Sequence, residues 1–257
     1  MTGMRIATWN VNSVRTRLEH LVNFITERNV DVVLLQELKC ETAAFPREYF
    51  EDMGYDCLVY GQKSYNGVAI LSKYNVECLK MGNEIFENDT QARYVEALVN
   101  GYVLASVYVP NGQDVEAPAY EYKLNFLKIL ANHVKEASQD EKFIIGGDFN
   151  IARSDADVYN PKAWKGKVCC TERERELFED LINVGLRDIE REFATHENEP
   201  IYTWWDYRRF AFAKNYGLRL DYLLATPNVE VQNCFVDKSV RAQERPSDHA
   251  PVVVDIQ

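Results

Sequence analysis

Residues 94–109 read YVEALVNGYVLASVYV, two runs rich in apolar and β-branched residues separated by Asn100-Gly101. An Asn-Gly pair between two such runs is the strongest short-range signal of a two-residue hairpin turn. The segment therefore predicts two neighbouring antiparallel strands. A fold that contains such a hairpin differs from one in which a helix connects every strand to the next parallel strand.

Further strands are expected on both sides of this hairpin. Strand-like runs lie at residues 4–10, 32–37, 67–72, 143–150, 201–205, 219–225, 229–236 and 251–256. Helical spacing of apolar residues occurs instead at residues 13–29, 120–135 and 171–184, the first with Ser13 as a candidate N-cap. Runs of strands separated by a few helices predict an α+β fold, in which two sheets pack together and helices cover their outer faces.

The chain shows no repeat, low-complexity tract or linker, so we expect one domain over residues 1–257. Residues 160–170, NPKAWKGKVCC, are the best candidate for a long functional loop. The six cysteines are scattered without the spacing of a zinc site, which indicates reduced thiols. No apolar run is long enough to cross a bilayer and the first residues have no secretory pattern, so we expect an intracellular protein without a membrane partner.

The formal net charge of −11 argues against simple electrostatic capture of nucleic acid. It does not exclude a nucleic-acid enzyme, because a metal site concentrates carboxylates and a local basic strip can coexist with an acidic remainder. The acidity alone is weak evidence for a cation site, since solvated surface charge explains most such compositions.

Several predicted strands begin at, end at or are interrupted by an acid or an amide, and the interruption is Asp221 within residues 219–225. These residues are Asn10, Glu37, Asp148, Asn150, Asp221 and the pair Asp248-His249. Each one alone has an ordinary explanation as a turn residue or a solvated carboxylate. If the two sheets pack face to face, however, their strand ends converge at one edge, and the gathered carboxylates repel each other unless a cation neutralises them. Oxygen ligands favour Mg²⁺ or Mn²⁺ over Zn²⁺.

A hard cation, several carboxylates and one imidazole suit the hydrolysis of a phosphodiester. The metal polarises a phosphoryl oxygen, a carboxylate orients or deprotonates the attacking water, and the imidazole hydrogen-bonds the developing charge. Two other chemistries lack their motifs. The segment GGDFN does not continue into a phosphate-binding Gly-Lys-Ser/Thr loop, and no GxSxG elbow for acyl transfer is present.

The same segments, in their order along the chain, resemble a known family. The motifs are TWNVNSVR (8–15), LLQELK (34–39), VYVPNG (107–112), GGDFNI (146–151), LRLDYLLA (218–225) and PSDHAPV (246–252). Together they resemble the exonuclease III family of apurinic/apyrimidinic endonucleases, within the endonuclease/exonuclease/phosphatase superfamily. GDFN and SDH mark only the superfamily, whereas LQE-K, GVAILSK, WWDYR and GLRLDYLLA are specific to the repair branch. The resemblance covers essentially the full chain.

The resemblance implies a DNase I-like fold, a four-layer sandwich of two mainly antiparallel sheets flanked by helices. It also implies a Mg²⁺-dependent DNA repair phosphodiesterase, with Mn²⁺ as a substitute. Such an enzyme cuts double-stranded DNA 5′ of an abasic site and leaves a 3′-hydroxyl, and it also has 3′→5′ exonuclease and 3′-phosphodiesterase activities at 3′ ends. A monomer is expected. Because the first predicted strand begins near the first residue, we also expect a prokaryotic, cytoplasmic protein.

The resemblance assigns roles residue by residue. Its metal ligands correspond to Asn10, Glu37, Asp148, Asn150, Asp248 and His249, with Glu37 as the principal one. Its catalytic residues correspond to Tyr108, Asp148, Asn150, Asp221 and His249. Asp148 positions or activates the attacking water, while Tyr108 and Asn150 hold the scissile phosphate. Asp221 orients His249, which either stabilises the pentavalent phosphate or acts as the base.

Substrate recognition follows from the same resemblance. Trp204, Leu218 and Leu220 match the apolar walls of a pocket that accepts a base-free deoxyribose turned out of the helix. Arg93 and Asn111 are expected to contact DNA phosphates, with Lys63, Lys165 and Lys167 as further candidates. One position departs from the pattern: Asn12 stands where some relatives carry an acid, which leaves the number of metal ions open.

Two alternatives have different sequence requirements. An enzyme for phospholipid headgroups or small phosphoesters would keep the metal site but would normally lack WWDYR and LRLDYLLA, which this chain has. A non-catalytic scaffold would be expected to lose one or more of Glu37, Asp148, Asp221 and His249, all of which are present.

Overall fold

The hairpin predicted at residues 94–109 is present in the computed structural model, which describes residues 3–257. β6 (Tyr94–Val99) and β7 (Tyr102–Tyr108) pair antiparallel. Asn100 and Gly101 make the turn with φ angles of 49° and 82°. Both angles are positive, as a type I′ turn requires, so the hairpin forms for the reason that its sequence indicates.

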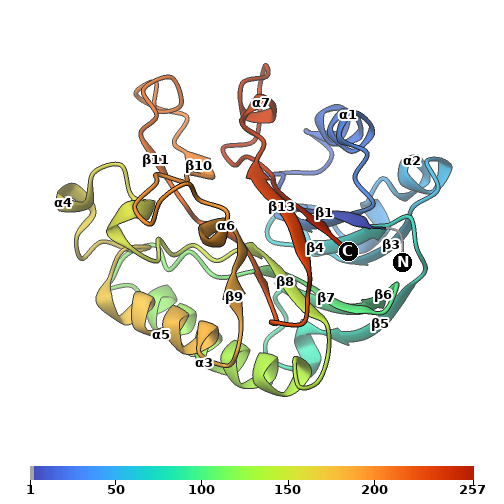
Figure 1. Ribbon diagram of the computed structural model, residues 1–257, viewed down its shortest axis with the longest axis horizontal. Helices are drawn as coiled ribbons and strands as arrows, with labels where there is room; N and C mark the ends of the chain where they lie inside the picture. Colours follow the sequence, from blue (N-terminus) through green and yellow to red (C-terminus); the bar gives the residue numbers. More distant parts are fainter. Residues whose placement is uncertain (1–2) are drawn as a thin grey trace.

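Two six-stranded sheets form the centre of the molecule (Figure 1). The first has the order β13 (Val231–Val236), β14 (Val252–Ile256), β1 (Met4–Asn10), β2 (Val32–Gln36), β4 (Val68–Ser72) and β3 (Asp56–Tyr60). The second has the order β5 (Val76–Met81), β6, β7, β8 (Phe143–Asp148), β12 (Asp221–Ala225) and β9 (Arg187–Asp188). Each sheet has one parallel pair, β1 with β2 and β7 with β8, and its other neighbours are antiparallel. The predicted α+β class with mainly antiparallel sheets is confirmed.

Helices cover the outer face of each sheet and complete the four predicted layers (Figure 1). α1 (Leu18–Arg28) and α2 (Arg47–Asp52) pack on the first sheet, and α3 (Pro118–Ala137) and α5 (Glu172–Ile182) pack on the second. The shorter elements are β10 (Trp204–Trp205), β11 (Gly217–Leu218), α4 (Pro161–Trp164), α6 (Ile189–Glu192), α7 (Lys238–Arg241), η1 (Thr42–Ala44), η2 (Gly82–Glu84) and η3 (Asp155–Asp157). Alternate strand residues, such as Ile6 and Leu34 in the first sheet and Leu104 in the second, build one apolar layer between the sheets.

The two sheets approach each other closely at the glycine pair of β8. A Cβ atom on Gly146 would lie 2.8 Å from a side-chain carbon of Leu34 in the first sheet, and one on Gly147 would lie 1.9 Å from the carbonyl oxygen of Val107. Only glycine fits at both positions. Gly146 therefore allows β8 to approach the first sheet, and Gly147 allows it to approach β7 within its own sheet, close to the end of β8 where the candidate site lies.

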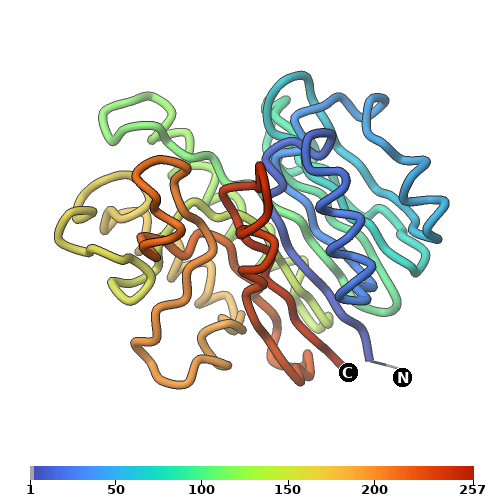
Figure 2. The backbone as a smooth tube through the Cα atoms, turned by 90° about the horizontal axis from the view of Figure 1, so that it is seen from above, coloured from blue at the N-terminus to red at the C-terminus, as the bar shows by residue number. Residues whose placement is uncertain are grey.

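The C-terminal strand lies next to the N-terminal one, although they are at opposite ends of the sequence. Figure 2 shows β14 (red) beside β1 (blue), and Met4 pairs with Ile256 in this ladder. The long loops of residues 150–170 and 200–216 lie on the other side of the red strand in this view. No helix in the described part of the chain is long and apolar enough to span a bilayer.

The prediction for Ser13 is wrong. Ser13 has a φ of 86° and its backbone N–H donates to the carbonyl oxygen of Glu37 at 2.8 Å. α1 begins only at Leu18, after a turn, with Arg17 in the N-cap position. Ser13 therefore belongs to the connection between β1 and β2 and does not cap the helix.

Two strands and one loop also differ from their predictions. The strand expected at residues 201–205 shortens to β10, and the strand expected at 219–225 begins only at Asp221. The reason is a change of partner: Leu218 pairs with Trp204 in the small sheet, whereas Asp221 pairs with Asp148 in the large one. The loop expected at residues 160–170 contains the short helix α4.

Candidate active site

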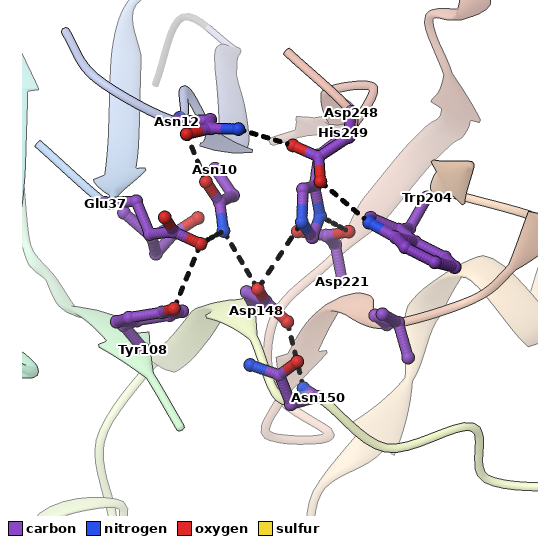
Figure 3. A network of polar contacts seen from close by, with 12 residues as sticks. Asn10, Asn12, Glu37, Tyr108, Asp148, Asn150, Trp204, Asp221, Asp248 and His249 are labelled. Carbon is purple, nitrogen blue, oxygen red and sulfur yellow. Dashed lines mark hydrogen bonds and ion pairs between the residues drawn. The ribbon is translucent and has the colours of Figure 1, made fainter. Parts of the chain in front are cut away.

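The polar strand ends that the sequence predicts to converge do converge. Asn10 and Gln36 end the parallel strands β1 and β2, and Tyr108 and Asp148 end the parallel strands β7 and β8. Asp221 begins β12 directly opposite Asp148. Both sheets therefore bring their polar strand ends to one edge, where the side chains point toward one another (Figure 3).

Two carboxylates lie on either side of the Asn10 amide. The Nδ2 atom of Asn10 donates to Glu37 Oε1 and to Asp148 Oδ2, each at 2.9 Å. The Tyr108 hydroxyl donates to the same Glu37 oxygen at 2.9 Å, and the Lys39 ammonium lies 2.9 Å from the other. Donors therefore surround the Glu37 carboxylate and fix its direction toward Asp148.

The donor atoms of this group fit a divalent cation. Ligand atoms of Glu37, Asp148 and His249 all lie within 4.8 Å of one another. Two ligands on opposite sides of an octahedral Mg²⁺ are about 4.2 Å apart, so only small movements are needed to bring carboxylates of this kind onto one ion. Carboxylate oxygens are the ligands that Mg²⁺ and Mn²⁺ prefer.

Asn10 and Asp248 are placed differently from these three predicted ligands. Asn10 presents its NH₂ group to the carboxylates, and its Oδ1 accepts from the Asn12 backbone at 3.0 Å. The Asp248 carboxylate accepts from Trp204 Nε1 and Asn12 Nδ2, both at 2.9 Å, and is not among the grouped ligand atoms. Their roles as metal ligands stay predictions.

His249 is held between two buried aspartates. Its Nδ1 lies 2.8 Å from Asp221 Oδ2, and its Nε2 lies 3.6 Å from Asp148 Oδ2. Thr203 donates its hydroxyl to the same Asp221 oxygen at 2.6 Å and accepts the backbone N–H of Asp221 at 3.0 Å. Asp221 therefore has a fixed orientation, and through its contact with Nδ1 it turns Nε2 of the imidazole toward Asp148.

Burial and neighbouring charges shift the pKa values of this group. Burial raises the pKa of Asp148 to about 7, against the effect of His249, and the charges of Asp221 and Glu37 add to the rise. Burial alone lowers the pKa of His249, but Asp221, Asp148 and Asp248 outweigh it and raise the pKa to about 10. The imidazole is therefore protonated at neutral pH, and a cation beside Asp148 would favour the charged carboxylate.

The loop that carries Asp248 and His249 is fastened to β1. Ser247 donates its hydroxyl to the Asn10 carbonyl at 2.7 Å, and the Trp9 indole donates to the His249 carbonyl at 3.1 Å. Burial raises the pKa of Asp248, but His249, Trp204 and Asn12 outweigh it and lower the pKa below its usual value. These two hydrogen bonds therefore fix the loop relative to β1 of the first sheet.

Asn150 and Asn111 form the side of the site next to the end of β8. The Asn111 amide donates to Asn150 Oδ1 at 3.1 Å, and the Asn150 amide donates to the Val109 carbonyl at 2.9 Å. The backbone N–H of Asn150 donates to Asp148 Oδ1 at 2.9 Å. Asn111 and Asn150, both predicted to contact phosphate, therefore touch each other, and Asn150 also touches Asp148.

The predicted pocket residues also lie together. Trp204 packs on a cluster that contains Leu218 and Leu220, and Cys169 and Trp164 belong to the same group. Leu218 and Leu220 are almost fully buried, whereas Trp204 is half-buried. This apolar cluster borders the polar site because Trp204 also donates to Asp248.

The predicted cationic contacts are less closely tied to the site. The Arg93 guanidinium lies over the rings of Tyr108 and Tyr122, 4.9 and 5.9 Å from their centroids. Lys63 is exposed, and Lys165 is exposed in the segment after α4. Lys167 lies 5.9 Å from the Trp164 ring. Of the four, only Arg93 contacts a residue of the polar group.

The residues of the network without a role assigned from the sequence include Lys39, Thr203, Ser247 and Arg17, whose guanidinium donates to the Pro246 carbonyl at 3.0 Å. Lys39 follows Glu37 by two residues and also donates to Asn12 Oδ1 at 2.6 Å. A lysine so close to a candidate ligand in LQELK was a usable signal. The other three act through hydrogen bonds between distant segments, which no local pattern indicates.

Backbone strain gathers at this edge. Asn12, Glu37, Lys39 and Asn150 all have positive φ angles, between 46° and 53°. Non-glycine residues in this region cost of order 1 kcal/mol or more each, and such residues cluster at sites where a side chain must be aimed. The strained backbone conformations here orient the side chains of the residues that follow β1, β2 and β8.

Comparisons with known proteins agree with this arrangement. The sequence profile of the Endonuclease/Exonuclease/phosphatase family matches residues 7–249. Exodeoxyribonuclease III of Haemophilus influenzae is 33% identical over 97% of this chain and 98% of its own length. The structure of the 3′ phosphatase NExo from Neisseria, bound to a product DNA hairpin, superposes with a TM-score of 0.96 at 37% identity and covers 99% of both chains. An AP endonuclease from Archaeoglobus fulgidus superposes with a TM-score of 0.92 at 33% identity over 98% of both chains. The chain therefore belongs to the endonuclease/exonuclease/phosphatase family, in its exodeoxyribonuclease III branch.

Proposed function

We propose that this protein is a Mg²⁺-dependent DNA repair phosphodiesterase. It cuts double-stranded DNA 5′ of an abasic site and leaves a 3′-hydroxyl, and at 3′ ends it acts as a 3′→5′ exonuclease and a 3′-phosphodiesterase. The observation that carries the proposal is the Asp221–His249–Asp148 arrangement beside Glu37. The relatives named above, an exodeoxyribonuclease III, a 3′ phosphatase and an AP endonuclease, support the same substrate class.

Asp148 is the residue that orients and deprotonates the attacking water. Its Oδ1 accepts from the Asn150 backbone and its Oδ2 accepts from Asn10, so the carboxylate is held in one orientation. A carboxylate held in this way can orient a water molecule and take its proton. Without a cation beside it, burial raises the pKa of Asp148 to about 7, and a bound cation would lower this pKa and keep the carboxylate charged and ready to accept the proton.

His249 has the complementary role of donor. Asp221 holds Nδ1, and the raised pKa keeps a proton on Nε2, which faces the space beside Asp148. An imidazolium in this position hydrogen-bonds a non-bridging phosphoryl oxygen as negative charge develops on it. This assignment makes Asp148 the base and His249 the charge-stabilising group, a choice that the sequence left open.

The phosphate is held by neutral groups. Tyr108 lies beside Glu37, and Asn150, which Asn111 contacts, lies beside Asp148. Amide N–H and hydroxyl groups can donate to phosphate oxygens. Glu37 and Asp148 would hold the metal, whereas the protonated Nε2 of His249 would face the phosphate instead of the ion. When bound, Mg²⁺ supplies a positive charge that polarises the phosphoryl group and stabilises the leaving oxygen.

The apolar cluster supplies the lesion specificity. Trp204, Leu218 and Leu220 border the polar site and would contact a sugar that lacks its base. A sugar that still carries its base would need more space between the same walls. DNA contacts outside this region are expected to be weak and salt-sensitive, because the chain has a net charge of −11.

The test is incubation of the protein with a DNA duplex that carries one tetrahydrofuran abasic analogue, with either Mg²⁺ or EDTA. We expect a single nick 5′ of the analogue with Mg²⁺ and none with EDTA. A hairpin with a 3′-phosphate and a duplex with a recessed 3′ end test the other two activities. Absence of the nick with Mg²⁺ would refute the endonuclease proposal, and full activity of Asp148→Asn would refute the assigned base.

A further inference from the structure

Behind the candidate site lies an ion pair that is fully buried. Lys123 of α3 and Glu174 of α5 both have no exposed surface, and Lys123 Nζ lies 2.5 Å from Glu174 Oε1. Lysine and glutamate are almost never fully buried unless they are paired. The pair is not part of the polar group described above, so its position needs a separate explanation.

Each of the three ammonium protons of Lys123 has one acceptor. Besides Glu174, Nζ donates to the backbone carbonyls of Asn150 at 2.7 Å and of Asn111 at 3.1 Å. An ammonium group has three donors and no acceptor, so the group is saturated. The same cation therefore joins the two loops whose side chains are proposed to hold the phosphate.

Glu174 makes a corresponding set of contacts with a third loop. Its Oε1 also accepts from the backbone N–H of Cys169 at 3.0 Å, and its Oε2 accepts from the N–H and hydroxyl of Thr171. The contacts with Thr171 form the capping box of α5, for which a glutamine would serve as well. The contacts with Lys123 and Cys169 are not needed for capping. Cys169 packs with Leu218 and Leu220 in the apolar cluster.

We propose that the Lys123–Glu174 pair is a positioning device that sets the phosphate-contact loops and the wall of the sugar pocket relative to each other. This inference rests on the proposed function, because it takes Asn111 and Asn150 as phosphate contacts. Lys123 holds the carbonyls of both residues, and Glu174 holds the backbone of Cys169. The side chains of Asn111 and Asn150 also contact each other, so a shift in one carbonyl moves both amides.

Stability alone does not account for a charged pair at this place. Desolvation of two charges offsets much of their attraction, and a well-packed apolar pair of similar volume is often equally stable. The packing of α3 on α5 could therefore be achieved without charge. An apolar pair, however, could not hold three loops by directed hydrogen bonds, and Asn150 and Cys169 need such support because their φ angles are 51° and 74°.

Two variants separate positioning from folding. Lys123→Met/Glu174→Gln removes both charges and the three donors while keeping the capping box, so no buried charge is left unpaired. Lys123→Arg keeps the positive charge but moves the donors to the ends of a larger planar group. The matched control is His133→Leu/Glu96→Gln, which removes another pair between α3 and the second sheet, where His133 Nε2 lies 2.8 Å from Glu96 Oε2.

The first readout is steady-state nicking of the tetrahydrofuran duplex with Mg²⁺. For both Lys123 variants we expect kcat to fall about 10- to 100-fold with KM changed less than threefold, because a displacement of about 1 Å at reacting groups costs about this much. The control should keep the wild-type kcat. If the pair had a purely structural role, kcat would fall only in variants whose melting temperature also falls. A folded Lys123→Arg protein with wild-type kcat would overturn the inference.

The second readout does not depend on activity. In ¹⁵N-labelled protein, both Lys123 variants should shift the side-chain amide signals of Asn111 and Asn150 and the backbone signal of Cys169, whereas the control should leave them in place. Unchanged signals in either folded variant would overturn the inference. If the wild-type protein fails to nick any of the DNA substrates, the proposed function fails, and these signals still decide whether the pair positions the three loops.

Discussion

The contact between Asp221 and His249 gives the sharpest prediction, for the variant Asp221→Asn. The substitution keeps the shape of the side chain but removes its charge, and Asp221 is the largest of the influences that raise the pKa of His249 to about 10. Burial lowers this pKa, whereas Asp148 and Asp248 still raise it in the variant, so we expect the pKa of His249 to fall below its wild-type value of about 10 toward the usual value of a histidine. If the pKa falls fully to the usual value of about 6.5, the imidazole is only about 3% protonated at pH 8, so an enzyme that needs the imidazolium loses up to about 30-fold in rate.

The sign of the pH effect follows from the same reasoning. Because protonation of His249 recovers as the pH falls, the rate of Asp221→Asn relative to wild type should rise about tenfold or more between pH 8 and pH 6. The assay is single-turnover nicking of a tetrahydrofuran duplex at saturating enzyme and Mg²⁺, together with an NMR titration of the His249 ring. Asp255→Asn is the control, because Asp255 lies on β14 of the first sheet and pairs with Arg5 away from the site. A ratio that is independent of pH, or a wild-type rate at pH 8, would refute the role of His249 as a donor.

Three further predictions concern the metal, the support of Asp221 and the fold. Mg²⁺ should raise the melting temperature of the wild-type protein. At 100 times its dissociation constant, Mg²⁺ adds about 2.7 kcal/mol to the free energy of unfolding, and most of this gain should be lost in Glu37→Gln. An equal rise in both proteins would place the ion elsewhere. Thr203→Val removes the hydroxyl that donates to Asp221 at 2.6 Å, so we expect a stability loss of about 1–3 kcal/mol by urea unfolding and a lower kcat. An unchanged kcat would show that Asp221 needs no such support. Gly147→Ala places a Cβ atom 1.9 Å from the Val107 carbonyl, which should cost about 3 kcal/mol or more, and a melting temperature equal to wild type would contradict the close packing of β7 and β8.

The sequence predicted the strands whose side chains are buried, and it missed three of the four edge strands, β3, β5 and β9, although it predicted the fourth, β13. β1, β2, β4, β8 and β14 carry apolar runs, and each lies near its predicted position. β5 and β3 were not predicted, since both are edge strands of their sheets and β5 exposes most of its side chains. A solvent-facing edge strand has little hydrophobic pattern to detect. It forms because a neighbouring strand offers unpaired backbone N–H and C=O groups, and this pairing depends on the tertiary structure and not on the local sequence.

The site was predictable to the extent that it depends on strand ends. Glu37, Asp148, Asp221 and His249 each stand beside an apolar run, and the topology then brings them together. The residues that hold them were not predictable, because a hydrogen bond such as that from Thr203 to Asp221 joins segments that follow different local rules. Whether the chain is monomeric, cytoplasmic and one domain stays a prediction.

The geometry of the site is set by how the two sheets pack, because neither sheet contains a complete site. Glu37 follows a strand of the first sheet and Asp148 ends a strand of the second, and their separation is the distance between the sheets at this edge. That distance is limited by Gly146, where a Cβ atom would lie 2.7 to 3.1 Å from side chains of both sheets. A hydrogen bond of 3.0 Å from Gln36 to Ser106 also joins the sheets at the same end. A metal bound by both carboxylates would span the interface of the sandwich, and the packing beneath it would set the spacing of the two ligands.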